Sequence, residues 1–196
     1  MTIDKAKELA YMFHEGQIRA DGITPYIEHP KMVAELVEKF GGSEECICVA
    51  WLHDIWEECL DKFCDYFDIE KETLDNKMRI FRFLKDKKEW SDIKYLLMNI
   101  SDNWTSDQEK IKKRGKVAYL SSLLVDGNTD LILVKLCDML ANITESKGTR
   151  MSQEKRYYKA IQCLKMAERK DLDERHKELI VKFEALYNIH KSRRNS

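Results

Sequence analysis

The chain has 196 residues, of which 43% are hydrophobic, so it is long enough to bury a core and within the range of one compact domain. Lys and Arg total 34 against 35 Asp and Glu, so the formal net charge is -1, and no global attraction to DNA, RNA or an anionic membrane is expected. The 7 Gly, 2 Pro and 35% charged residues favour long helices. We predict an all-α fold, one bundle of about eight to ten helices over residues 1–190 with a frayed tail over 191–196.

The N-terminus and the cysteines predict a cytoplasmic protein. The opening MTIDKAKELAYMF lacks a basic region followed by an apolar run, so it does not resemble a secretory signal peptide, and no stretch is apolar enough for a membrane span. The six cysteines have no CxxC spacing, which argues against a zinc knuckle or a disulfide framework. Reduced thiols are the simplest interpretation.

The N-terminal half is expected to contain three helices. Apolar spacing predicts a helix over Ile3–Phe13, followed by a loop over Arg19–Pro30 that holds Asp, Gly and Pro turn residues. Pro30 then opens a helix that runs to Phe40 and stops at two glycines. Ser43 is the expected N-cap of a mostly apolar helix over Glu44–Glu58.

The remaining chain is expected to be helical with short separators. A short segment at Phe63–Phe67 and a helix at Glu72–Leu84 divide a region of mixed charge and aromatic content. Asp-Gly-Asn and Lys-Gly separators then delimit further amphipathic segments. These predicted helices are Trp90–Ile100, Ser106–Val125, Thr129–Glu145, Ser152–Arg169 and Asp173–His190.

Two histidines in the first half are candidate metal ligands. His53 and Asp54 stand side by side in the apolar predicted helix, and although adjacent helical positions diverge by about 100°, both side chains can still converge on one ion. Taken alone, such a pair is more often a polar surface pair, and His29, in a loop before Pro30, is by itself a surface histidine. Neither feature alone predicts a site.

Polar residues also interrupt the apolar segment LILVKLCDMLANI. Lys135, Asp138 and Asn142 stand where burial is expected, and Asp138 and Asn142 share one helix face. A buried carboxylate needs a cation, a metal ion or several hydrogen-bond donors. A structural and a functional role for Asp138 therefore remain equally open.

Glu57 and Glu58 follow the His-Asp pair by one helical turn. They could serve as general base or acid, and the alternative is a solvated helix end. The joint occurrence of two imidazoles and two carboxylates is more informative, because this N/O ligand set suits Mn, Fe, Zn or Co. Such an ion can lower the pKa of bound water and so produce a hydroxide nucleophile.

Three sequence blocks occur in a specific order. They are H-x-x-Q-x-R followed by D-G-x-T-P-Y-I-x-H-P, then L-H-D-x-x-E-E, then V-K-L-x-D-x-L-x-N-I. In this order they resemble the HD-superfamily hydrolase domain of the bifunctional RelA/SpoT-type alarmone synthetase/hydrolases. They also resemble the small, stand-alone alarmone hydrolases related to metazoan SpoT homologues. The resemblance reaches from the first predicted helix to Leu164 and implies one HD-type domain.

The resemblance also implies roles for individual residues. It assigns the metal ligands, usually for Mn²⁺ with Fe, Co or Zn as alternatives, to His29, His53, Asp54 and Asp138. Glu57 and Glu58 fall at the family's acidic catalytic pair, commonly Glu-Asp, so the second position departs conservatively. Substrate contacts are implied for Arg19, Asn142 and either Tyr157 or Tyr158.

The interval between Glu58 and Ser101 is longer than in compact members, and Trp56 is bulky for its position. The substrate is therefore less secure than the reaction class.

Basic side chains offer further substrate contacts. Lys135, Lys112 and Arg114 could offset phosphate charge, the last two within a basic cluster that runs to Lys116. The alternative for that cluster, a solvated helix face, is the more common case.

The sequence thus predicts a metal-dependent nucleotide phosphohydrolase that removes the 3′-pyrophosphate from ppGpp-like alarmones. Two alternatives stay open. The first keeps the site and changes the substrate, to NADPH as a 2′-phosphatase or to a dNTP or another signalling nucleotide. The second is a degenerate nucleotide-binding or interaction module. The expected partner is a small nucleotide, without nucleic acid or membrane, and homo-oligomerisation is left open.

Overall fold

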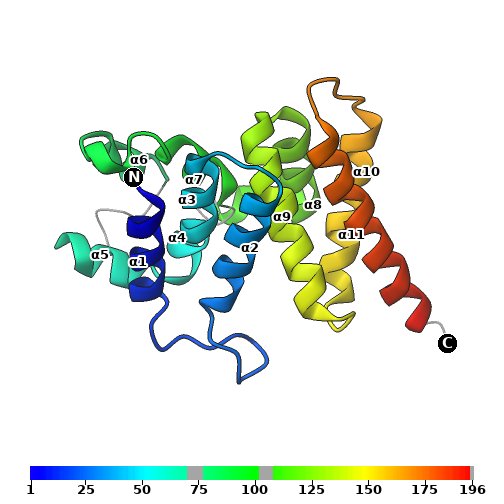
Figure 1. Ribbon diagram of the computed structural model, residues 1–196, viewed down its shortest axis with the longest axis horizontal. Helices are drawn as coiled ribbons and strands as arrows, with labels where there is room; N and C mark the ends of the chain where they lie inside the picture. The colour runs from blue at the N-terminus through cyan, green and yellow to red at the C-terminus, as the bar shows by residue number, and fades with distance from the viewer. Residues whose placement is uncertain (70–76, 102–107, 195–196) are drawn as a thin grey trace. The chain divides into compact units, whose positions relative to one another are not determined.

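The computed structural model describes residues 1–69, 77–101 and 108–194, with the side chains at 77–79, 81 and 108–114 left out (Figure 1). All regular elements in this part of the chain are helices, which confirms the all-α prediction. The chain divides into two compact units, Met1–Gln108 and Glu109–Ser196. No helix in the described ranges is long and apolar enough to cross a bilayer.

The first unit is built around α3. Its helices are α1 (Ile3–Phe13), α2 (Glu28–Lys39), α3 (Glu44–Leu52), α4 (Ile55–Glu58), α5 (Leu60–Phe67), α6 (Lys77–Lys85), the 3₁₀ helix η2 (Lys88–Trp90) and α7 (Lys94–Ile100). Every residue of α3 from Cys46 to Leu52 is buried, which is why its sequence is apolar on all sides. Helices α1 and α2 both pack on it (Figure 1).

Side-chain caps define where these helices begin. Thr2 Oγ1 accepts a hydrogen bond from Lys5 N at 3.3 Å, and Ser43 Oγ accepts one from Cys46 N at 3.3 Å. Each cap satisfies a backbone donor that has no partner inside its helix. The predicted starts of α1 and α3 are therefore correct.

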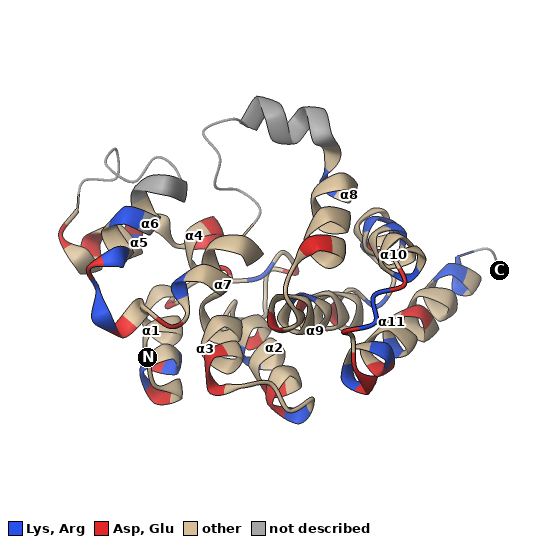
Figure 2. Ribbon diagram, turned by 90° about the horizontal axis from the view of Figure 1, so that it is seen from above, with Lys and Arg blue, Asp and Glu red and all other residues tan. Residues whose placement is uncertain are grey.

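The second unit is built around α9. It contains most of α8 (Gln108–Asp126), together with α9 (Thr129–Ser146), α10 (Met151–Met166) and α11 (Glu174–Arg193). All residues of α9 from Leu131 to Ala141 are buried, and α11 packs on both α9 and α10. Figure 2 shows acidic and basic residues interspersed along α10 and α11. The unit therefore buries α9 and exposes the charged faces of its later helices.

Several predicted boundaries were wrong. The helix predicted over Ser106–Val125 is interrupted at Gly115, whose φ of 70° and ψ of 146° are not helical. The segment predicted at Trp90–Ile100 divides into η2 and α7. The predicted starts at Glu72 and Ser106 lie outside the described residues. Helix α11 continues to Arg193, so the first residues of the predicted tail are helical.

Candidate metal centre

The His53-Asp54 pair lies between two helices, which corrects the single helix predicted over Glu44–Glu58. His53 is the C-cap of α3, and Asp54, at φ -95° and ψ -3°, precedes α4. The backbone N–H groups of Glu57 and Glu58 donate to the Asp54 carbonyl at 3.1 and 2.9 Å. The apolar sequence continues across this point, so its pattern carries no signal of the break.

The orientation of His53 is set by the backbone of its own helix. The ring is buried, and Nδ1 lies 2.8 Å from the Ala50 carbonyl oxygen, which can only accept a hydrogen bond. In the neutral form of the ring, the proton is therefore on Nδ1 and Nε2 presents its lone pair. Nε2 lies 3.1 Å from Asp54 Oδ1. This is the arrangement in which metal-binding histidines are usually held.

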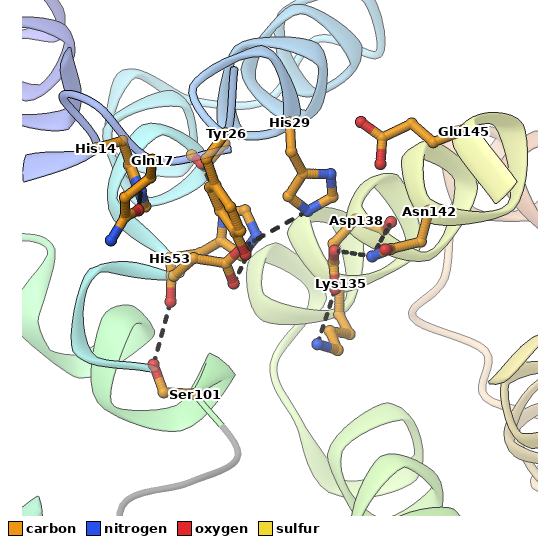
Figure 3. A network of polar contacts seen from close by, with 12 residues as sticks. His14, Gln17, Tyr26, His29, His53, Ser101, Lys135, Asp138, Asn142 and Glu145 are labelled. Carbon is orange, nitrogen blue, oxygen red and sulfur yellow. Dashed lines mark hydrogen bonds and ion pairs between the residues drawn. The ribbon is translucent and has the colours of Figure 1, made fainter. Parts of the chain in front are cut away.

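His29 approaches the same carboxylate from α2. It was predicted in a loop, but it lies in the first turn of α2 and is 2% exposed, which excludes the surface alternative. Its Nε2 lies 3.7 Å from Asp54 Oδ2, and its ring stands edge-on to His53 with centroids 5.3 Å apart. The first unit thus brings two imidazoles and one carboxylate together (Figure 3).

Tyr26 was missed as a site residue because the sequence presents it as an apolar neighbour of His29. Its hydroxyl donates to Asp54 Oδ2 at 2.9 Å, and its ring stacks on His14 with centroids 4.8 Å apart. Burial, followed by the negative charge of Asp54, raises the pKa of Tyr26. The phenol therefore stays protonated and acts as a hydrogen-bond donor.

The H-x-x-Q pair joins the end of α1 to the end of α4. Gln17 Nε2 donates to the Glu58 carbonyl at 2.8 Å, and Gln17 Oε1 lies 2.8 Å from His14 Nδ1. Cys59 Sγ lies 3.2 Å from the same nitrogen, and burial raises the pKa of this thiol to about 12. Burial also lowers the pKa of His14. His14 and Cys59 are buried and Gln17 is partly exposed, and the three form an uncharged support beside the site.

Arg19 lies on the loop that leads to Tyr26. Its Cζ is 5.1 Å from the centroid of the Tyr26 ring, a cation–π distance. Asp21 fixes the turn by accepting from the Thr24 hydroxyl at 2.6 Å and from the backbone N–H groups of Ile23 and Thr24 at 2.9 Å each. These hydrogen bonds lower the pKa of Asp21 to about 2. The turn thus holds the predicted basic residue beside the aromatic ring.

Glu57 and Glu58 form the last turn of α4. Glu57 is partly exposed and Glu58 is exposed. Partial desolvation, followed by repulsion from Asp54, raises the pKa of Glu58, while the positive charges of Arg19 and His29 oppose this shift. The Glu58 carboxylate thus interacts electrostatically with the candidate ligands Asp54 and His29. A raised pKa suits a group that exchanges protons near neutrality.

The second unit contains a polar cluster on α9. Lys135 Nζ lies 2.8 Å from Asp138 Oδ2, and Asn142 Nδ2 donates to Asp138 Oδ1 at 2.6 Å. Both charged groups are buried. Burial alone would lower the pKa of Lys135, but the charge of Asp138, with smaller contributions from two tyrosines, raises it well above its usual value. Lys135 therefore stays protonated, and Figure 3 shows its contact with Asp138.

The other residues predicted to contact the substrate lie on α10 and α8. Tyr157 is buried on α10, where its hydroxyl accepts from Gln153 Nε2 at 2.7 Å and its ring packs against Phe183. Tyr158 stacks on Tyr187 with centroids 4.4 Å apart. The side chains of Lys112 and Arg114 lie outside the described residues.

Comparison with known proteins identifies the family. No match was found among curated proteins. A family model described as the HD domain matches residues 6–170, which include both histidines, Asp54 and Asp138. The match covers most of the sequence, and the buried His53-Asp54 pair lies within it. The chain therefore belongs to the HD-domain family, whose members are generally metal-dependent hydrolases.

Proposed function

We propose that the chain is a metal-dependent phosphohydrolase that releases pyrophosphate from the 3′ position of ppGpp-like alarmones. The observation that carries this proposal is the convergence of His29 and His53 on the Asp54 carboxylate, at 3.7 and 3.1 Å. Two buried imidazoles around one carboxylate would supply three of the four N/O ligands proposed for a divalent cation.

The proposed ligands of this cation are His29, His53, Asp54 and Asp138. The choice is supported by three buried side chains, because His29, His53 and Asp138 offer two imidazole nitrogens and a carboxylate oxygen as a candidate donor set. The tautomer that Ala50 imposes on His53 fits this role. Mn²⁺ is the proposed ion, with Fe, Co or Zn as alternatives. When bound, such an ion would lower the pKa of a water molecule and polarise a phosphoryl oxygen.

The chain's own residues would manage protons and charge. Glu58 is the proposed general base. The raised pKa of its carboxyl group, and the contributions of the Asp54 and His29 charges to that pKa, support this choice. Glu57, on the same helix turn, is its proposed partner. Arg19, whose guanidinium lies over the Tyr26 ring, would neutralise phosphate charge.

The nucleotide part of the proposal is supported by the sequence blocks that resemble alarmone hydrolases. The first block supplies His14, Gln17 and Arg19, and all three lie around Tyr26 or the end of α4. Asn142, Tyr157, Lys135, Lys112 and Arg114 are proposed as further contacts to the sugar, base or phosphates. Asn142 and Lys135 would have to serve Asp138 at the same time.

The test is release of phosphate and pyrophosphate from ppGpp, pppGpp, ppApp, NADPH and dNTPs with Mn²⁺. Asp54→Ala is compared with Asp65→Ala, which changes an exposed carboxylate on α5 in the same unit. We expect pyrophosphate from an alarmone, lost in Asp54→Ala and kept in Asp65→Ala. Release of phosphate from NADPH or of phosphate or pyrophosphate from a dNTP would support the proposed metal site but assign it another substrate. No turnover of any compound would favour the degenerate binding module.

A further inference from the structure

The hydroxyl of Tyr26 hydrogen-bonds to one carboxylate oxygen of Asp54, a proposed metal ligand. It donates to Asp54 Oδ2 at 2.9 Å, the oxygen that lies 3.7 Å from His29 Nε2, while Oδ1 lies 3.1 Å from His53 Nε2. We infer that Tyr26 is a positioning residue that fixes the plane of the Asp54 carboxylate for the metal ion. The inference rests on the proposed function and assigns a residue to it.

A carboxylate on a short side chain can rotate about its terminal bond, and this rotation decides which lone pairs face an ion. The Tyr26 hydroxyl removes that freedom by holding Oδ2 from one side. Asp54 is only 16% exposed, so little water is present to replace a lost donor. Hydrogen bonds from neighbouring groups orient metal ligands in this way.

Tyr26 is itself held on several sides. Its ring stacks on His14 at an interplanar angle of 11° and stands edge-on to His29 with centroids 6.4 Å apart. Its backbone N–H donates to the Gln17 carbonyl at 2.9 Å. The hydroxyl is therefore placed before any ion binds, so binding needs little further ordering of this side chain.

The aromatic ring and the hydroxyl have separable roles. The ring fills the space between His14 and His29, which Phe would fill equally well. The hydroxyl alone reaches Asp54. Tyr26→Phe therefore removes the proposed positioning contact and leaves the packing in place.

The experiment measures Mn²⁺ affinity of the full chain by calorimetry and by the electron paramagnetic resonance signal of unbound Mn²⁺. Tyr26→Phe is compared with wild type and with Tyr66→Phe, which makes the same change in the aromatic cluster around Phe13. We expect Tyr26→Phe to bind Mn²⁺ roughly 10- to 100-fold more weakly, the usual effect of losing an orienting partner. Tyr66→Phe should bind like wild type, and all three should unfold at similar temperatures without metal.

A second variant, His14→Ala, keeps the hydroxyl but removes the ring on which Tyr26 stacks, and it should weaken Mn²⁺ binding in the same direction. Equal affinity of Tyr26→Phe and wild type would overturn the positioning role while leaving the metal centre intact. A wild-type chain that binds no Mn²⁺ would overturn the proposed function, and the role of Tyr26 with it.

Discussion

Lys135 Nζ lies 2.8 Å from Asp138 Oδ2 inside the most buried helix of the second unit, and the two residues are one helical turn apart. Asn142, one turn further along, donates to the other carboxylate oxygen at 2.6 Å. A single helix thus supplies a cation and an amide donor to its own buried carboxylate. Asp138 therefore has structural partners on its own helix, and its role as a metal ligand stays a prediction.

We expect Lys135→Met to destabilise the protein by about 3–5 kcal/mol, because it leaves the buried Asp138 carboxylate without its cation. Chemical denaturation of the metal-free chain measures the free energy of unfolding. Lys177→Met, which breaks an exposed pair with Glu174 on α11, should cost less than about 1 kcal/mol. Adding Asp138→Asn to Lys135→Met should restore part of the loss, and an unchanged double variant would argue against the charge explanation.

A second buried carboxylate joins three helices. Glu154 on α10 accepts from Ser146 Oγ at the end of α9 and lies 3.1 Å from His190 Nδ1 on α11, and all three side chains are buried. Glu154→Ala leaves the buried Ser146 hydroxyl and the buried His190 ring without this hydrogen-bond acceptor. We expect a loss of about 3 kcal/mol in the free energy of unfolding, against little change for the exposed Glu174→Ala. Equal denaturation curves for the two variants would contradict this role.

Much of the fold could be predicted because the helix signals are local. The helices α1, α3 and α9 begin at the predicted residues Ile3, Glu44 and Thr129, and Ser43 is the N-cap that the sequence predicted for α3. The order of the candidate ligands along the chain was also visible, since it depends only on residue types. Signals of this kind act between residues close in the sequence, so they can be recognised without knowledge of the tertiary structure.

The parts that were missed depend on contacts between distant segments. The hydrogen bond from Tyr26 to Asp54 joins residues 28 positions apart, and that from Gln17 to Glu58 spans 41. No periodicity encodes such contacts. The break after Leu52 was missed for a related reason: apolar residues continue on both sides of it, so only the backbone geometry at Asp54 reveals it.

Glu58 gives a prediction for pH dependence. Its pKa is raised, so a carboxylate that acts as general base becomes protonated, and activity falls, at a pH above the ordinary range for Glu. We expect kcat/KM of the wild type to decline on this acidic side and Glu58→Gln to lose most activity together with that decline. Glu38→Gln, an exposed change on α2, should keep the wild-type profile. An unaltered profile in Glu58→Gln would remove it as the base.

The metal centre predicts a change in stability that needs no substrate. An ion that binds only the folded chain adds RT ln(1 + [L]/Kd), about 2.7 kcal/mol at 100 times Kd, so Mn²⁺ should raise the unfolding temperature and a chelator should reverse the rise. His53→Ala should lose the response, because it removes the Nε2 that faces Asp54. His176→Ala is the matched control: this buried histidine contacts Asp173 and the Thr129 carbonyl, so the variant should be less stable yet keep its Mn²⁺ response. If Mn²⁺ stabilised wild type and His53→Ala equally, the ion would bind elsewhere on the chain.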